Sequence, residues 1–438
     1  MIKKLTYLVK KSIIVFVFFM SLMVNFQLLG QVDVKPNYKS FQDKYKLKTS
    51  LGFQLWSTYT MNEKRFDEAS NSYVNVDDRW NNQLRRSRLS VSGQPYPGLS
   101  FKLTASLDLV GRDAFAATQG GNNNTSVGQF GLWNMYVRWK PFANSDLLHI
   151  TGGFQPPQIG RESITGALNS TSFEKSWSQN YLRRSIVGVG SGRAMGVNIG
   201  GQKKVNQYFS FSYDLGGFNP QAFSNVNNSA GIQSSPLFVG RLALYFGQPE
   251  SERYSTGHKI NYFGKRNGLT LALAGSRQGR TDVFDRNEAL GFDWLLNYGM
   301  LNVDGEWTFF SRNKWIEENN YASHSSGGYL RIGYNIELSN QHFLEPVLMI
   351  VKFNGPLSST AQNDASIINA FAGNDEVIDI GLNYHLNPKL KISITYTINQ
   401  GELGESLPGA TFNNYYRNSN KQAIERGNLL GFALVGIF

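Results

Sequence analysis

Apolar and polar residues alternate with a period of two along most of the chain beyond residue 45. The clearest segment, residues 390–399 (LKISITYTIN), places aliphatic and aromatic side chains on one face and Lys, Ser, Thr and Asn on the other. The same alternation occurs in residues 101–109, 131–140, 209–215, 301–309 and 378–386. Successive side chains of a β-strand point to opposite faces, so the pattern predicts an all-β chain of half-apolar strands.

Three further features favour a membrane barrel, with a polar lumen face, over a soluble sandwich. Short connections, such as 141–145 and 387–389, alternate with long polar ones, such as 111–127 and 400–426. Aromatic residues gather near strand ends, as interfacial girdles require. The last segment alternates and ends in Phe438, the kind of terminal aromatic that the barrel-assembly machinery reads. We therefore expect a transmembrane antiparallel β-barrel, and we expect the assembly machinery to bind it through Phe438.

The alternation and the connections together predict about sixteen strands, enough to enclose an aqueous channel. The expected ranges are 45–60, 80–95, 98–110, 128–140, 145–155, 192–202, 206–217, 236–247, 268–277, 288–298, 300–312, 326–338, 342–353, 375–386, 389–399 and 427–438.

The alternation assigns the side chains of residues 131–140 to the two faces, whereas two other segments depart from the expected pattern. In residues 131–140 the alternation puts Trp133 on the apolar face that would meet lipid. Segment 342–353 is apolar on both faces, so its lumen face should contact a loop or a neighbouring subunit. The connection 248–267 lies on the side of the short connections yet is long, which leaves room for an extra hairpin.

The alternation stops between Gly152 and Gly196, for about forty residues, which is far longer than an ordinary connection. Pro156 and Pro157 should end the preceding strand, because neither can donate a ladder hydrogen bond. A long charged segment between strands is either a surface flap or a part of the chain folded into the lumen. We expect a constriction loop over about 155–191, and its position decides the function.

Composition excludes several classes of function. The chain has no cysteine, which rules out disulfides, cysteine-ligated metals, a cysteine nucleophile and a lipid anchor. Its five histidines are dispersed and no GxSxG motif is present, so we expect no enzyme, no cofactor and no metal site. The positive charge is too diffuse for a nucleic-acid surface.

Residues 1–30 have the pattern of a secretion signal. Four lysines precede the apolar run 12–24, which is too short to cross a bilayer as a helix. Cleavage near Gly30 lowers the formal charge from +11 to +7 and leaves a short arm, 31–44, before the barrel, 45–438. The expected location is the bacterial outer membrane, among outer-membrane lipid and lipopolysaccharide.

Five short motifs point to a known family: RSRL (86–89) ahead of Gly93, GFQ (153–155) followed by Pro157 and Glu162, FEKS (173–176), RAMGV (193–197) and GRL (240–242). With them the chain resembles the phosphate-selective porin O and P family over most of residues 80–438. Gln155 stands where that family usually has Lys, and Lys175 where it usually has Arg. The resemblance implies a trimeric sixteen-stranded porin whose third long external loop folds into the pore.

Cations on the lumen side are the candidate selectivity residues, because rings of Arg or Lys favour anions. Five of them lie on the expected strands, namely Arg86, Arg88, Arg138, Arg241 and Arg331. The other five lie on the long loop or directly after it, namely Arg161, Lys175, Arg183, Arg184 and Arg193. Each could instead belong to a solvated wall, and Arg183 and Arg184 could bind lipopolysaccharide phosphates at the rim. We expect a passive porin for small hydrophilic, anionic, phosphate-type solutes; the alternative is a non-transport barrel serving adhesion or secretion.

Overall fold

The computed structural model describes residues 42–113, 115, 128–220, 232–338, 342–406, 412–419 and 422–438. The chain divides into Met1–Leu47 and Lys48–Phe438, and the second unit contains the barrel. The expected signal peptide (1–30) and the arm up to residue 41 lie outside the described residues. No helix in the described part of the chain is long and apolar enough to cross a membrane.

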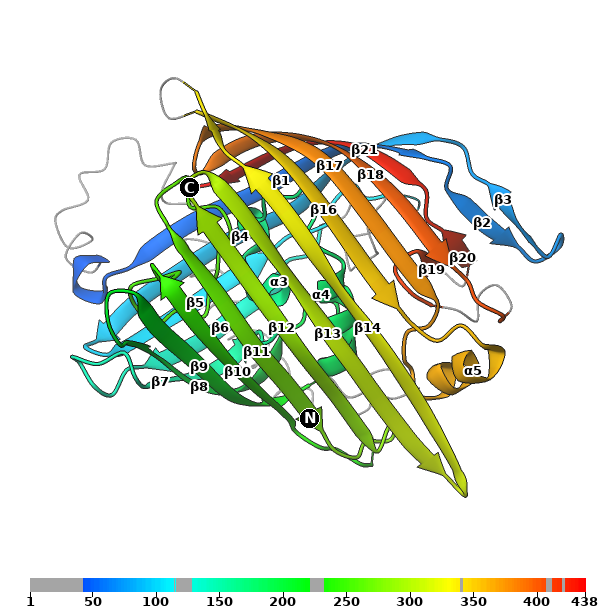
Figure 1. The fold of residues 1–438 in the computed structure, drawn as a ribbon, viewed down its shortest axis with the longest axis horizontal. Helices are drawn as coiled ribbons and strands as arrows, with labels where there is room; N and C mark the ends of the chain where they lie inside the picture. The colour runs from blue at the N-terminus through cyan, green and yellow to red at the C-terminus, as the bar shows by residue number, and fades with distance from the viewer. Residues whose placement is uncertain are drawn as a thin grey trace, which may run out of the picture. The chain divides into compact units, whose positions relative to one another are not determined.

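Sixteen antiparallel wall strands close into a barrel, as the alternation predicted (Figure 1). The sheet has seventeen strands, but β15 continues β14 beyond a break at Asn335 and both pair with β16. The wall strands are β1 (Lys48–Met61), β4 (Arg79–Tyr96), β5 (Leu99–Ser106), β6 (Gly131–Trp139), β7 (His149–Gln155), β8 (Ala194–Lys204), β9 (Phe209–Asn219), β10 (Leu237–Gly247), β11 (Gly268–Gln278), β12 (Arg286–Tyr298), β13 (Leu301–Ile316), β14 (Asn319–Tyr334) with β15 (Ile336–Glu337), β16 (Phe343–Asn354), β17 (Asn374–Asn387), β18 (Leu390–Glu402) and β21 (Asn428–Ile437).

The barrel closes where the first wall strand pairs with the last. In β1 and β21 the register runs from Gly52 opposite Ile437 to Met61 opposite Asn428. Leu51 and Phe438 exchange two backbone hydrogen bonds, of 2.9 and 2.7 Å. The terminal aromatic ring therefore lies at the seam, so the last strand has no unpaired edge beside β1.

The two faces of the wall follow the predicted division. In β18 the outward Ile392 and Ile394 are 48% and 42% exposed, whereas the inward Ser393 and Thr395 are both 3% exposed. Trp133 is the exception to the expected faces. In β6 it is skipped in the pairing, since Thr104 faces Asn134 and Ala105 faces Leu132. This bulge turns the Trp133 side chain into the lumen, because one extra residue reverses the alternation.

Helices and a small second sheet lie in four of the long connections. The connection between β7 and β8 contains α3 (Arg161–Ile164), η1 (Ala167–Asn169) and α4 (Ser178–Ile186). The β16–β17 connection contains α5 (Ser359–Ile367). Two hairpins, β2 (Lys64–Asp67) with β3 (Ser72–Asn75) and β19 (Tyr416–Ser419) with β20 (Gln422–Glu425), form a four-stranded sheet in the order β19-β20-β2-β3.

The long turn 248–267 contains no extra hairpin. All of its residues are described, and none belongs to a wall strand. Its one β-type contact is a parallel bridge from His258 to Thr165 of the β7–β8 connection. We call residues 248–267 the lumenal strap.

Candidate pore constriction

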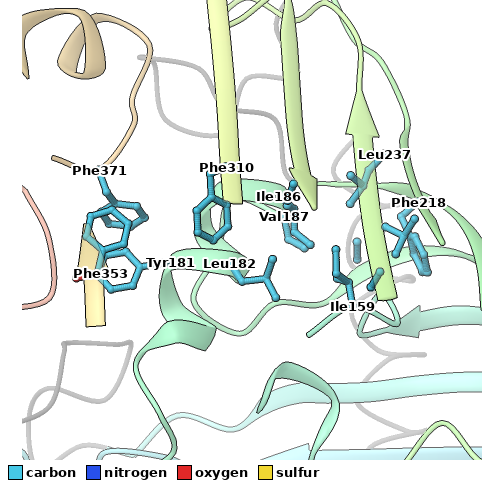
Figure 2. Packing of buried hydrophobic residues seen from close by; sticks show 14 residues of the cluster. Ile159, Tyr181, Leu182, Ile186, Val187, Phe218, Leu237, Phe310, Phe353 and Phe371 are labelled. Carbon is cyan, nitrogen blue, oxygen red and sulfur yellow. The ribbon is translucent and has the colours of Figure 1, made fainter. Parts of the chain in front are cut away.

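The β7–β8 connection, residues 156–193, folds into the lumen, and we call it the constriction loop. Strand β7 ends at Gln155, directly before the two prolines, as predicted. Helix α4 is amphipathic: Tyr181, Leu182 and Ile186 are buried against the wall, and the two arginines between them lie on the other side. Figure 2 shows this apolar face packed on side chains from the inner wall.

The inner wall under α4 is apolar, whereas many other inward side chains of the wall are polar or charged. Tyr181 stacks on Phe353 of β16, with ring centroids 3.8 Å apart and planes at 6°. Trp177 packs with Met349 and Val351 of the same strand. Segment 342–353 is thus apolar on both faces because its lumen face meets the constriction loop, one of the two contacts that its sequence predicted.

The tip of the loop crosses to the seam of the barrel. Leu168 and Phe173 pack with the buried residues of β1 and β21, and Phe173 stacks on Trp56 with ring centroids 4.3 Å apart. Lys391 of β18 donates a 2.8 Å hydrogen bond to the Ser170 carbonyl. The loop therefore follows the wall from β10 through β18 to β21 and β1, and it leaves open the side formed by β4 to β8.

A buried ion cluster ties the loop to this wall at Arg331. Its Nη2 lies 2.9 Å from Glu162 Oε2 in α3 and 2.7 Å from Asp304 Oδ2 in β13. All three side chains are at most 1% exposed. Removing the buried guanidinium would be costly, because each of the two carboxylates would lose the positive charge that it pairs with.

A second buried ion cluster lies around Arg161. This arginine contacts Asp293 of β12 (3.1 Å) and Glu250 of the lumenal strap (2.8 Å). Arg241 of β10 shares the same Asp293 at 2.8 Å. The predicted site residues Arg161, Arg241 and Arg331 thus lie behind the loop, between it and the wall, and none of them lines the cavity described next.

A cavity of about 1210 Å³ lies on the open side of the constriction loop. Among the described residues its lining includes three carboxylates, Asp108, Glu174 and Glu250. It also includes nine basic side chains, namely Arg85, Arg86, Arg88, Lys102, Lys175, Arg183, Arg184, Arg193 and Lys259. The lining therefore has a surplus of six formal positive charges, with His258 counted as neutral.

Six of the ten predicted site residues lie on this cavity. They are Arg86, Arg88, Lys175, Arg183, Arg184 and Arg193. Arg138 does not line the cavity; its side chain donates hydrogen bonds to Thr151 (3.2 Å) and Thr256 (2.5 Å). Because Arg183 and Arg184 line the lumen, they are not placed to bind lipid phosphates on the outer rim.

Three cations of the lining have mainly neutral hydrogen-bond partners. Lys175 Nζ donates to the carbonyls of Glu162 and Thr165. Arg183 donates to the Ser163 carbonyl (2.6 Å), and Arg193 to a backbone carbonyl. Burial, and then repulsion from Arg183, hold the pKa of Lys175 well below its usual value. An anion in the cavity would relieve this repulsion.

Two β-bulges bring extra side chains to the lining. Arg85 is skipped between the pairs Gln54–Arg86 and Leu55–Leu84, so Arg85 and Arg86 both reach Glu174. The second bulge is at Trp133, whose ring lies 3.9 Å from the Arg88 guanidinium and 3.8 Å from that of Arg193. Cation–π contacts of this kind fix the two guanidinium groups against one indole.

No pattern in the sequence indicated these two bulges. Alternation alone assigns Trp133 to the lipid face, and it cannot tell which of two adjacent arginines turns inward. Sequence reasoning therefore missed Trp133, and it included Arg85 only as a neighbour in the basic cluster 85–88, without assigning its side chain to the lumen face. Lys259 was missed for a different reason, since it lies on the lumenal strap, whose place in the lumen no pattern indicates.

Glu174 couples the loop tip to β4, and this coupling should persist in mild acid. Burial alone would raise the pKa of Glu174, but the positive charges of Arg85 and Arg86 outweigh this effect and lower the pKa to about 2. A carboxyl with a depressed pKa stabilises the fold above its unfolded value, and that stabilisation is lost as pH falls toward the folded value. We expect the single-channel conductance to stay constant from pH 7 to 5 and to change only as pH approaches 2.

The variant Glu174→Gln provides the control for this pH dependence. It should show at pH 7 the altered conductance that the unmodified chain shows only in strong acid. Equal conductance of the two proteins at pH 7 would contradict the assignment.

Comparison with known structures shows the fold. The chain is similar to OprB of Pseudomonas putida (TM-score 0.54, 10% identity, 93% of this chain and 97% of that chain). It is also similar to an anion-selective porin from Comamonas acidovorans (0.51, 11%, 89% and 98%) and to OmpF of Salmonella typhi (0.50, 11%, 91% and 99%).

Sequence comparison adds no family to this result. The chain matches no protein-family model and no curated protein sequence. The resemblance to the phosphate-selective porin O and P family therefore rests on the short motifs. What is shown is broader: the chain has the sixteen-stranded barrel fold of the outer-membrane porins.

Proposed function

We propose that the protein is a passive diffusion channel of the bacterial outer membrane for small hydrophilic anions. The main support for this proposal is the surplus of six positive charges on the cavity lining. Basic side chains that line a narrow passage attract anions and repel cations. Anions would pass between the constriction loop and the wall formed by β4 to β8.

Oxyanions of the phosphate type are the solutes that the lining suits best. Arg183 and Arg193 present planar guanidinium groups, which can bind two oxygens of one anion at once. Both are held by backbone carbonyls instead of carboxylates, so an oxyanion would not have to displace an acidic partner. Gln155, where the resembled family usually has Lys, donates to the Thr151 carbonyl and adds no charge.

A swelling assay with liposomes tests the channel function. Vesicles that contain the protein should swell in isotonic solutions of an organic phosphate faster than in those of an amine cation of equal size. The alternative function, an adhesion or secretion scaffold, predicts a plugged lumen and hence no swelling with either solute. The open cavity of about 1210 Å³ favours the channel.

The short strands support a homotrimer. Strands β5, β6 and β7 have 8, 9 and 7 residues. At about 3.3 Å per residue and a tilt of about 40°, β7 would span roughly 18 Å, less than the apolar band of about 25 Å. This part of the wall would be covered best by another copy of the chain. A light-scattering mass of three chains in detergent is expected, and a monomer mass would contradict the proposal.

A further inference from the structure

The lumenal strap is anchored on two sides of the barrel and contacts the constriction loop. We propose that the strap is the second side of the constriction, with Glu250 as the positioning residue that locks it to the loop. The width of the pore would then depend on a contact between a long loop from one end of the barrel and a turn from the other. This inference rests on the proposed channel function and names a further determinant of it.

The first half of the strap is anchored to β8 and β9. The Tyr254 hydroxyl donates to Asp214, and Asn198 donates to the same hydroxyl at 3.1 Å. The Tyr254 ring also lies 4.8 Å from the His149 ring of β7. Buried partners on three neighbouring strands fix this half against one side of the lumen.

The second half of the strap is anchored on the opposite wall. Asn261 exchanges hydrogen bonds of 2.7 and 2.9 Å with Asn335 and donates to Glu345 of β16 at 2.9 Å. Phe263 packs on Phe343, with ring centroids 5.0 Å apart. Because its two halves hold to different walls, the strap runs across the lumen and does not simply follow one side.

Between these anchors the strap contacts the constriction loop directly. His258 and Thr165 form a parallel bridge, and the Gly166 N–H donates to the His258 carbonyl at 3.3 Å. Glu250 lies 2.8 Å from Arg161 of the loop and 3.0 Å from His258 within the strap. The buried Glu250 carboxylate thus contacts both the loop and the strap at the junction, the place where the two meet.

The strap also forms part of the wall of the cavity. Its lining residues are Glu250, Ser251, Ser255, Thr256, Gly257, His258, Lys259 and Tyr262. A solute that has passed the basic cluster therefore meets the strap next. Displacing the strap would widen the passage there and would leave the basic residues of the loop and of β4 in place.

Two glutamates on the strap allow a matched comparison. Glu250 is 5% exposed and neutralises Arg161, whose other acidic partner, Asp293, is shared with Arg241. Glu252 is 76% exposed, and its ion pair with Lys204 is 3.9 Å long. Replacing Glu250 removes a buried charge from the junction, whereas replacing Glu252 removes a solvated charge of negligible effect.

Single-channel recording in planar bilayers should separate the two variants. Glu250→Gln should raise the open-channel conductance about twofold and retain the anion preference, because the basic lining remains. Glu252→Gln should match the unmodified chain. Unchanged conductance of Glu250→Gln, or an equal change in both variants, would overturn the role of Glu250.

Disulfide trapping tests the junction without relying on conductance. The chain has no cysteine, so Thr165→Cys with His258→Cys introduces the only pair. Residues bridged in this way are close enough for a disulfide. Oxidation should cross-link most of the folded barrels, whereas Thr165→Cys with Arg253→Cys should remain reduced. Failure to cross-link would overturn the strap contact even if the channel conducts, and cross-linking in a silent channel would refute only the transport function.

Discussion

Replacing Lys102 and Arg184 together with glutamate should lower the anion-to-cation permeability ratio by about tenfold, because fixed charges along a narrow passage set its ion preference. The double substitution reduces the surplus of positive charge on the lining from six to two. In the described part of the chain neither side chain has a hydrogen bond or an ion pair, and Arg184 Nε is buried without a partner. The effect of the double substitution should therefore be electrostatic, and the fold should stay intact.

The control for this variant carries the same charge change outside the cavity. Lys204 and Arg253 are exposed and do not line it. Lys204→Glu with Arg253→Glu should leave the permeability ratio within about twofold of the unmodified chain, because exposed charges are screened by salt. An equal loss of selectivity in both double variants would show that the net charge of the molecule, and not the lining, sets the preference.

Replacing Arg331 with methionine should release the constriction loop from the wall. Glu162 and Asp304 would lose their shared buried partner, at a cost of about 3–5 kcal/mol, whereas the backbone ladder of the barrel would be unaffected. We expect a conductance several times larger than that of the unmodified chain, with frequent fluctuations as the loop moves. The melting temperature of the detergent-solubilised protein should fall as well.

Lys352→Met is the matched control for this release. Lys352 pairs with Glu376 at 2.9 Å, but the two side chains are 50% and 33% exposed, so the pair contributes at most about 1 kcal/mol. This variant should conduct and melt like the unmodified chain. Normal conductance of Arg331→Met would contradict the conclusion that buried ion pairs hold the loop in the lumen.

The fold could be predicted because a membrane barrel repeats one simple requirement in every strand. Each wall strand needs alternate apolar residues toward lipid, so sixteen segments with a period of two predicted sixteen strands. The double-apolar segment 342–353 even indicated where the loop docks, since apolar side chains on a lumen face need a cover. The boundaries were predicted less accurately: β1 begins at Lys48, three residues later than expected.

The site was predicted only in part, because alternation assigns a residue to a face but not to a partner. Arg241 and Arg331 do point inward, yet Asp293, Asp304 and Glu162 pair with them behind the loop. These carboxylates come from distant parts of the chain, so no local pattern predicts the pairing. The lumenal strap posed the same problem, since its anchors lie on opposite walls of the barrel.

The decisive measurement is the reversal potential of the unmodified channel in a gradient of potassium chloride. We propose that solutes pass between the constriction loop and the wall from β4 to β8, where basic side chains outnumber acidic ones. We expect a reversal potential whose sign corresponds to chloride carrying most of the current. A potential of the opposite sign, with potassium as the main carrier, would contradict it.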